Sequence, residues 1–106
     1  MIYHRQQVQA VAMRPGLQRK TMATTEKLML AEFSAEAGTV VPVHTHPNEQ
    51  VGYVVRGQVK MTIAGVDYEL EAGDSYAIPA GVPHGAVFLT QAVVVDVFTP
   101  PREDYR

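Results

Sequence analysis

The sequence predicts an all-β domain, closed as a small barrel or a double-sheet jelly roll. Short runs of β-branched and aromatic residues recur about every eight to ten residues, separated by Gly, Pro, Asn or Asp, which is typical of short antiparallel strands. No amphipathic helical stripe competes with this pattern. Because nine short strands in 106 residues would leave long unpaired edges in an open sheet, a closed structure is expected.

The strands follow one another with short connections. The clear ones are Lys27–Phe33, Gln50–Arg56, Gln58–Ile63, Val66–Leu70, Ser75–Ile78, Gly85–Leu89 and Ala92–Phe98, and the weaker ones are Gln7–Ala12 and Leu17–Met22. The dipeptide Ala64-Gly65 between two alternating strands indicates a hairpin. Glycines at 38, 57, 73 and 81 are expected to supply positive φ or close backbone approach, and the tandem Pro100-Pro101 ends the last strand.

Composition limits the classes of function. A chain of 106 residues with 46% hydrophobic and 19% charged residues is expected to form one packed domain. The net charge of -2 and the scattered basic residues argue against nucleic acid as a partner, and no apolar run is long enough to span a membrane. With no cysteine, a metal would be held by imidazole, carboxylate or amide. We expect a cytoplasmic protein.

The stretch HTHPNEQ, residues 44–50, has the spacing of a metal site. On an extended backbone His44 and His46 project from the same face, since side chains alternate with period two. Gln50 keeps that parity and Glu49 faces the other way if the segment stays extended. Pro47-Asn48 could introduce a turn that resets the parity, so both Glu49 and Gln50 stay candidates on this ground.

His84 is a further candidate, held in a loop stiffened by Pro79 and Pro83, whereas His4 is interpreted as a surface residue. One histidine alone is more often a surface or hydrogen-bonded residue than a ligand. The combination of His-x-His with another histidine in a barrel-like pattern favours metal binding.

The same residues resemble both short motifs of the cupin superfamily. The first motif runs from Gly38 through TVVPV, His44 and His46 to Gly57, and the second runs from Gly73 through Pro79 and Gly81 to His84. The resemblance implies a double-stranded β-helix, or jelly roll, cupin barrel. It divides the single domain 1–106 into N-terminal strands (7–33), a metal-binding barrel (38–98) and a C-terminal tail (99–106).

The resemblance also implies a ligand set. The glutamate that cupins usually supply falls at Gln50, and their frequent asparagine falls at Phe88. A subset of cupins reads His-x-His-Pro-x-Glu-Gln, as here, and uses the glutamine oxygen. The implied ligands are therefore His44, His46, Gln50 and His84, around a divalent transition metal (Ni, Fe, Mn, Co or Zn). Without a carboxylate ligand the metal charge is uncompensated, which favours an oxygen-rich anion.

The C-terminal stretch carries a second clue. Asp96 lies within an otherwise apolar strand, where a carboxylate is costly without partners. Parity places it on one face with Phe98, and Arg102 follows; an Asp96–Arg102 ion pair that fastens the tail is one interpretation. The stretch also resembles the KdgF-like cupins of pectin degradation, which open and ketonise 4,5-unsaturated monouronates. That resemblance implies Asp96 as general acid or base, Arg102 as carboxylate partner and Phe98 as apolar wall.

Three functions stay open at this point: a metal-dependent lyase-like or isomerase-like enzyme on a small sugar acid, a dioxygenase, or a non-catalytic cupin that binds a small ligand. The substrate is expected to carry a carboxylate. A homodimer is expected, with residues 6–13 and 17–25 offering strand edges to a neighbour. The residues Met29, Tyr53, Met61 and Tyr76 fit either a pocket wall or core packing.

Overall fold

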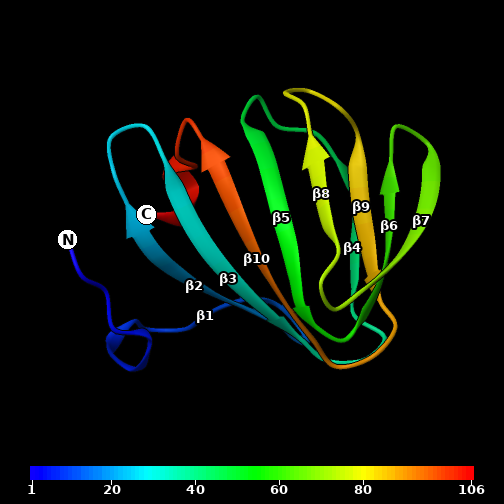
Figure 1. Cartoon of the computed structure of the whole chain (residues 1–106), viewed down its shortest axis with the longest axis horizontal. Helices are drawn as coiled ribbons and strands as arrows, with labels where there is room; N and C mark the ends of the chain where they lie inside the picture. The colour runs from blue at the N-terminus through cyan, green and yellow to red at the C-terminus, as the bar shows by residue number, and fades with distance from the viewer.

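The computed structural model describes all residues, 1–106, as two antiparallel sheets that close around one core (Figure 1). Two 3-10 turns, η1 (Arg5–Gln7) and η2 (Glu103–Tyr105), flank the strands. The strands are β1 (Val11–Arg14), β2 (Leu17–Thr24), β3 (Met29–Ala35), β4 (Val40–His44), β5 (Glu49–Arg56), β6 (Gln58–Ile63), β7 (Val66–Glu71), β8 (Ser75–Ile78), β9 (His84–Phe88) and β10 (Ala92–Thr99). The predicted jelly roll is confirmed.

The sheets have the orders β1-β2-β3-β10-β5-β8 and β4-β9-β6-β7. In Figure 1 the first sheet fans across the molecule from β2 to β8, and β9, β6 and β7 continue it around the barrel. Two rows of register are important for the site. Asp96 lies opposite Gly52, which lies opposite Tyr76, and Phe98 lies opposite Gln50, which lies opposite Ile78. Strands β10, β5 and β8 therefore supply neighbouring inward side chains.

Buried and more exposed residues alternate along the three strands that carry most of the core, β3, β5 and β10. In β3 the residues Met29, Ala31, Phe33 and Ala35 are buried, and in β10 the residues Ala92, Val94, Asp96 and Phe98 are buried. The inward residues of β5 are Gln50, Gly52 and Val54. Met29, Met61 and Tyr76 are likewise buried. The pocket-wall interpretation of Tyr53 is wrong, because Tyr53 has the opposite parity to Gln50 and is half exposed on the outer face.

The hairpin at Ala64-Gly65 joins β6 to β7, with φ of 50° and 79° at its two residues. Positive φ at both central positions matches the right-handed twist of the flanking strands. Two strand predictions need correction. The first strand begins at Val11 and not at Gln7, since residues 5–7 form η1, and the unpredicted strand β4 raises the number from nine to ten.

No helix in the structure is long and apolar enough to cross a membrane.

Candidate metal centre

Three histidines meet at one end of the barrel. His44 ends β4, His84 begins β9, and the two are direct partners across the antiparallel pair. His46 lies in the short loop between β4 and β5. The ring centroids are 4.4 Å apart for His44 and His84, 4.7 Å for His46 and His84, and 5.7 Å for His44 and His46. Their candidate ligand atoms all lie within 4.8 Å of one another.

The backbone fixes the same tautomer in all three rings. Each Nδ1 faces a carbonyl oxygen two residues away: Pro42 at 2.9 Å for His44, Asn48 at 3.0 Å for His46 and Val82 at 2.8 Å for His84. A carbonyl oxygen only accepts, so Nδ1 must carry the proton and Nε2 keeps its lone pair in the neutral ring. Metal-binding histidines are oriented in this way by outer partners.

One of these lone pairs has no partner. The Nε2 atom of His84 is buried and makes no hydrogen bond within the protein. A buried polar atom without a partner is costly, and its orientation toward the other imidazoles indicates an external partner there. Neutral imidazole nitrogens suit divalent transition metals, so the residues present fit a metal ion.

Gln50 completes the group. It is buried, and its Oε1 lies 3.0 Å from Nε2 of His46. With the His46 proton on Nδ1, these two atoms are both acceptors, an arrangement that a shared cation explains. The side chain of Gln50 also acts on Asp96, whose pKa it lowers. Glu49 points outward and is exposed, so the structure places Gln50, and not Glu49, beside the imidazoles.

Burial favours the neutral form of His46 and His84. Burial, followed by the positive charge of Arg102, lowers the pKa of His46 below its ordinary value of 6.5. Burial is also the largest cause of the lowered pKa of His84, and the neighbouring His44 and His46 act in the same direction. Because a metal binds the deprotonated imidazole, these shifts favour metal binding at neutral pH.

The two candidates at the end of the motif can be separated experimentally. We expect Gln50→Ala to weaken metal affinity at least about tenfold, because the side chain that faces His46 is lost, and Glu49→Ala to leave it nearly unchanged. Isothermal titration with Co²⁺, Ni²⁺ or Zn²⁺ measures both. Weaker binding in Glu49→Ala with normal binding in Gln50→Ala would contradict the assignment.

A cavity of about 360 Å³ lies beside the histidines. Its lining includes His44, His84, Asp96, Arg102 and Tyr76. Phe98 is fully buried next to it, with its ring centroid 5.9 Å from that of His46. The structure therefore places Asp96, Phe98 and Arg102 beside the histidine cluster.

Asp96 is the one buried carboxylate in the cavity wall. It is 4% exposed and accepts a hydrogen bond of 2.5 Å from the hydroxyl of Tyr76. Burial raises the pKa of Asp96 from 3.8 to about 6, while the hydrogen bonds from Tyr76 and Gln50 act in the lowering direction. Asp96 can therefore hold or release a proton near neutral pH.

The Asp96–Arg102 ion pair is not formed, so that interpretation is wrong. Arg102 instead pairs with Asp104 of the tail, with Nη2 3.1 Å from Oδ2. Its guanidinium carbon lies 5.7 Å from the centroid of the Phe98 ring and 4.2 Å from that of Tyr105. Since Asp104 is largely exposed, this surface pair is weak and can yield to a better anion.

Sequence reasoning missed Tyr105 and Arg19. The ring of Tyr105 packs edge-on against Phe33 and Phe98, and it carries the guanidinium of Arg19 at 4.4 Å as well as that of Arg102. Arg19 is 7% exposed and has only Thr21 and the sulfur of Met13 as hydrogen-bond partners. The signal that could have found Arg19 is its parity with Leu17, the inward residue two positions earlier.

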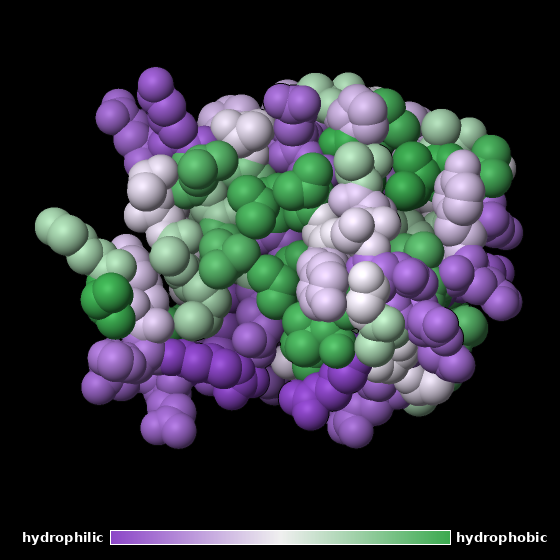
Figure 2. All heavy atoms as spheres, in the orientation of Figure 1, coloured by the Kyte–Doolittle hydropathy of each residue, from purple (hydrophilic) through white to green (hydrophobic).

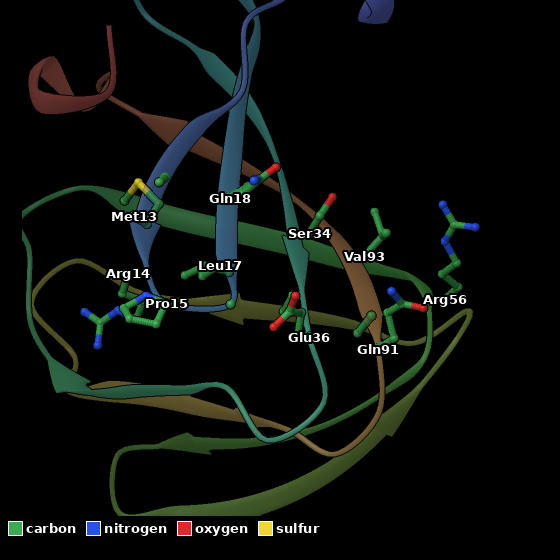
Figure 3. A pocket seen from close by; sticks show the side chains of 14 residues that line it. Met13, Arg14, Pro15, Leu17, Gln18, Ser34, Glu36, Arg56, Gln91 and Val93 are labelled. Atoms are coloured by element: carbon green, nitrogen blue, oxygen red, sulfur yellow. The ribbon is translucent and has the colours of Figure 1, made fainter.

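A second cavity, of about 820 Å³, lies where β2 and β10 begin and β3 and β5 end. Figure 3 shows Arg14, Glu36 and Arg56 around it. These three charged side chains are exposed, and none of the predicted site residues lines this cavity. It offers no chemistry comparable to the histidine cluster, despite its larger volume.

Comparison with known proteins agrees with this geometry. Residues 31–98 match the Cupin domain family. The chain belongs to the cupin family. This cupin superposes on an RmlC-like cupin from Shewanella frigidimarina with a TM-score of 0.96 and 34% identity, covering 99% of this chain and 95% of the other. It superposes on KdgF from Halomonas sp. with a TM-score of 0.95 and 32% identity, covering 100% and 98%.

Curated relatives match over shorter stretches. The HTH-type transcriptional regulator PuuR of Escherichia coli is 51% identical over 39 residues, which are 37% of this cupin and 21% of PuuR. The H2HPP isomerase of Bacillus subtilis is 35% identical over 78 residues, 72% of this cupin and 33% of the isomerase. This cupin thus spans about a fifth to a third of the curated relatives it matches.

Proposed function

We propose that this cupin is a metal-dependent, isomerase-like enzyme that opens and ketonises a 4,5-unsaturated monouronate. The observation that carries the proposal is that the His44–His46–His84 cluster, with Gln50 beside His46, lies at a cavity whose wall includes His44, His84 and the protonatable Asp96. The full-length similarity to KdgF supports the substrate class, and the similarity to H2HPP isomerase supports an isomerisation.

The reaction requires proton transfer at two places. Opening the hemiacetal ring breaks the bond between the anomeric carbon and the ring oxygen and removes a proton from the anomeric hydroxyl, which leaves an aldehyde and an enolate; ketonising that enolate adds one proton to carbon. Nothing is oxidised or reduced overall. Asp96, with its pKa near 6, can take one proton and give one back. A metal ion held by the three imidazoles and Gln50 would polarise the oxygens of the bound substrate.

The charges around the cavity favour a carboxylate. Arg102 lines the cavity and pairs only with the exposed Asp104, and the buried Arg19 behind Tyr105 has no acidic partner. A substrate carboxylate could replace Asp104 and pair bidentately with the Arg102 guanidinium. The buried ring of Phe98 lies 5.7 Å from this guanidinium and supports it from the core side.

Turnover of the substrate tests the proposal. The protein, purified with metal or reloaded with Mn²⁺, Fe²⁺, Co²⁺, Ni²⁺ or Zn²⁺, is mixed anaerobically with an unsaturated monouronate, and the ultraviolet absorbance of the C4–C5 double bond is followed. We expect a metal-dependent loss of absorbance that chelation prevents. A metal-loaded protein that leaves the absorbance at the spontaneous rate would refute the proposal. A strict requirement for oxygen would favour a dioxygenase instead.

The similarity to part of PuuR supports a second candidate function. In this alternative the protein is a cupin that binds a small ligand and acts on a transcriptional partner. Such a protein would bind its ligand and release it unchanged. Saturable binding of a small carboxylate, measured by calorimetry with no change in the recovered ligand, would favour this function over catalysis.

We also propose that the protein is a homodimer, joined through the outer face of β5, β8 and β10. Val51, Tyr53 and Val55 are each about half exposed there, and Figure 2 shows apolar side chains gathered over β5 and β10. Glu49 and Arg56 lie exposed at opposite ends of β5, so a two-fold axis would place each opposite the other. Strand β2 is covered by β1 over Leu17–Arg19, and so its expected free edge there is absent.

We expect Tyr53→Glu to dissociate the dimer, because it places two like charges near the symmetry axis in an apolar face. Light scattering after size exclusion should give the 11.6 kDa mass of one chain for the variant and twice that for the wild type. Tyr68→Glu, at an exposed tyrosine of β7, is the matched control and should leave the dimer intact. A monomeric wild-type protein would refute the interface.

A further inference from the structure

A row of three residues crosses the sheet behind the metal centre. Tyr76 of β8, Gly52 of β5 and Asp96 of β10 are direct partners across two neighbouring strand pairs. All three face the interior. The Tyr76 hydroxyl passes over the middle strand and donates to Oδ1 of Asp96 at 2.5 Å.

Gly52 makes this bridge possible. A Cβ atom added at Gly52 would overlap both Cζ of Tyr76 and Oδ1 of Asp96. The φ of Gly52 is not positive, so no left-handed conformation explains a glycine at this position. The absence of a side chain instead opens a slot in β5, and the phenol of Tyr76 and the carboxyl of Asp96 meet in it.

The bridge reaches the metal centre through Asp96. Its carboxyl accepts a hydrogen bond from Tyr76, and the side-chain amide of Gln50 lies close enough to lower the pKa of that carboxyl. The same amide presents its oxygen to His46. The hydrogen bond from Tyr76 therefore holds in place the group that moves the proton, beside the amide that faces the histidines.

We propose that Tyr76 is a positioning residue for Asp96, and that Gly52 is the slot through which it acts. The catalytic part of this inference rests on the proposed function, whereas the hydrogen bond from Tyr76 to Asp96 does not. A tyrosine that only filled the core would need its ring, which Tyr76→Phe keeps. The hydroxyl is the atom that the bridge requires.

The test compares Tyr76→Phe with Tyr68→Phe, whose hydroxyl is on an exposed residue outside the site. The first measurement is a proton NMR spectrum at low temperature. The hydroxyl proton of Tyr76, buried in a short hydrogen bond to Asp96, should give a downfield, slowly exchanging signal in the wild type and in Tyr68→Phe. The signal should vanish in Tyr76→Phe and in Asp96→Ala. Persistence of the signal in Tyr76→Phe would overturn the bridge.

The second measurement is turnover of the unsaturated monouronate. In Tyr76→Phe we expect kcat to fall by roughly 10- to 100-fold, because the acid–base group of Asp96 is no longer held in place. KM should change little. Bound metal per chain should equal that of the wild type. Unchanged kcat in a variant that has lost the NMR signal would show that the Tyr76 hydroxyl does not position Asp96 for catalysis.

The two measurements separate the two proposals. If the wild-type protein turns over no unsaturated uronate, the proposed function fails, and the NMR signal still decides whether the bridge exists. Gly52→Ala provides a second variant of the slot. It should lose the same signal while the Tyr76 hydroxyl is still present, provided that circular dichroism shows a folded β-protein. Retention of the signal in folded Gly52→Ala would contradict the role of the slot.

Discussion

His46→Ala is expected to abolish stoichiometric metal binding and all metal-dependent activity. The change removes one of three imidazoles whose candidate ligand atoms lie within 4.8 Å of one another, and it also removes the Nε2 atom that faces Oε1 of Gln50. Loss of an outer partner of a metal ligand already costs roughly 10- to 100-fold in affinity, so loss of a ligand should cost more. Elemental analysis of the purified variant checks the prediction.

Thermal unfolding provides an independent measurement. A metal that binds only the folded protein stabilises it by about 2.7 kcal/mol when its free concentration is 100 times its Kd. The wild-type protein should therefore unfold at higher temperature with metal, whereas His46→Ala should unfold at the same temperature with and without it. His4→Ala is the matched control, since His4 is exposed and lies outside the cluster. A metal-induced shift of wild-type size in His46→Ala would contradict the assignment.

Most of the fold could be predicted because alternation and turn chemistry are local signals. The strand that was missed, β4, contains Pro42 within its apolar run, and proline normally argues against a strand. The structure resolves this conflict by placing β4 at the edge of the four-stranded sheet, where a missing N–H is tolerated.

The residues of the candidate site likewise fall into those that local sequence signals predict and those that only the tertiary structure brings together. Period two within β5 separates Gln50 from Glu49, and the motif spacing identifies His44 and His46 although His46 lies in the loop after β4, so these residues could be predicted from the sequence. The partners of Asp96 could not, because Tyr76 is twenty residues away in sequence and reaches it only through the order β10-β5-β8. Arg19 was missed for a similar reason, since its burial depends on Tyr105 packing back from the C-terminal tail.

Asp96→Asn is expected to lower kcat by roughly 10² to 10⁴ while the metal stays bound, because it removes a general acid–base group and keeps its shape. Asparagine retains an oxygen that can accept the hydrogen bond from Tyr76, so the variant should fold. The uronate assay and elemental analysis measure the two effects. Asp67→Asn, at an exposed aspartate of β7, is the control and should behave as the wild type. An active Asp96→Asn protein would refute the proton-transfer role.

The same variant should be more stable than the wild type in the metal-free state above about pH 6. Burial raises the pKa of Asp96 from 3.8 to about 6, so the folded protein holds a proton there that the unfolded chain has released. The stability due to that proton is full below the lower value and is lost as pH rises through the higher one. Asparagine suffers no such loss, and so the difference in unfolding free energy between variant and wild type should grow over this range by up to about 3 kcal/mol. Denaturant unfolding from pH 4 to pH 7.5 measures it. A gain in stability joined to a loss of turnover is what a carboxylate retained for function, at the expense of folding, should produce.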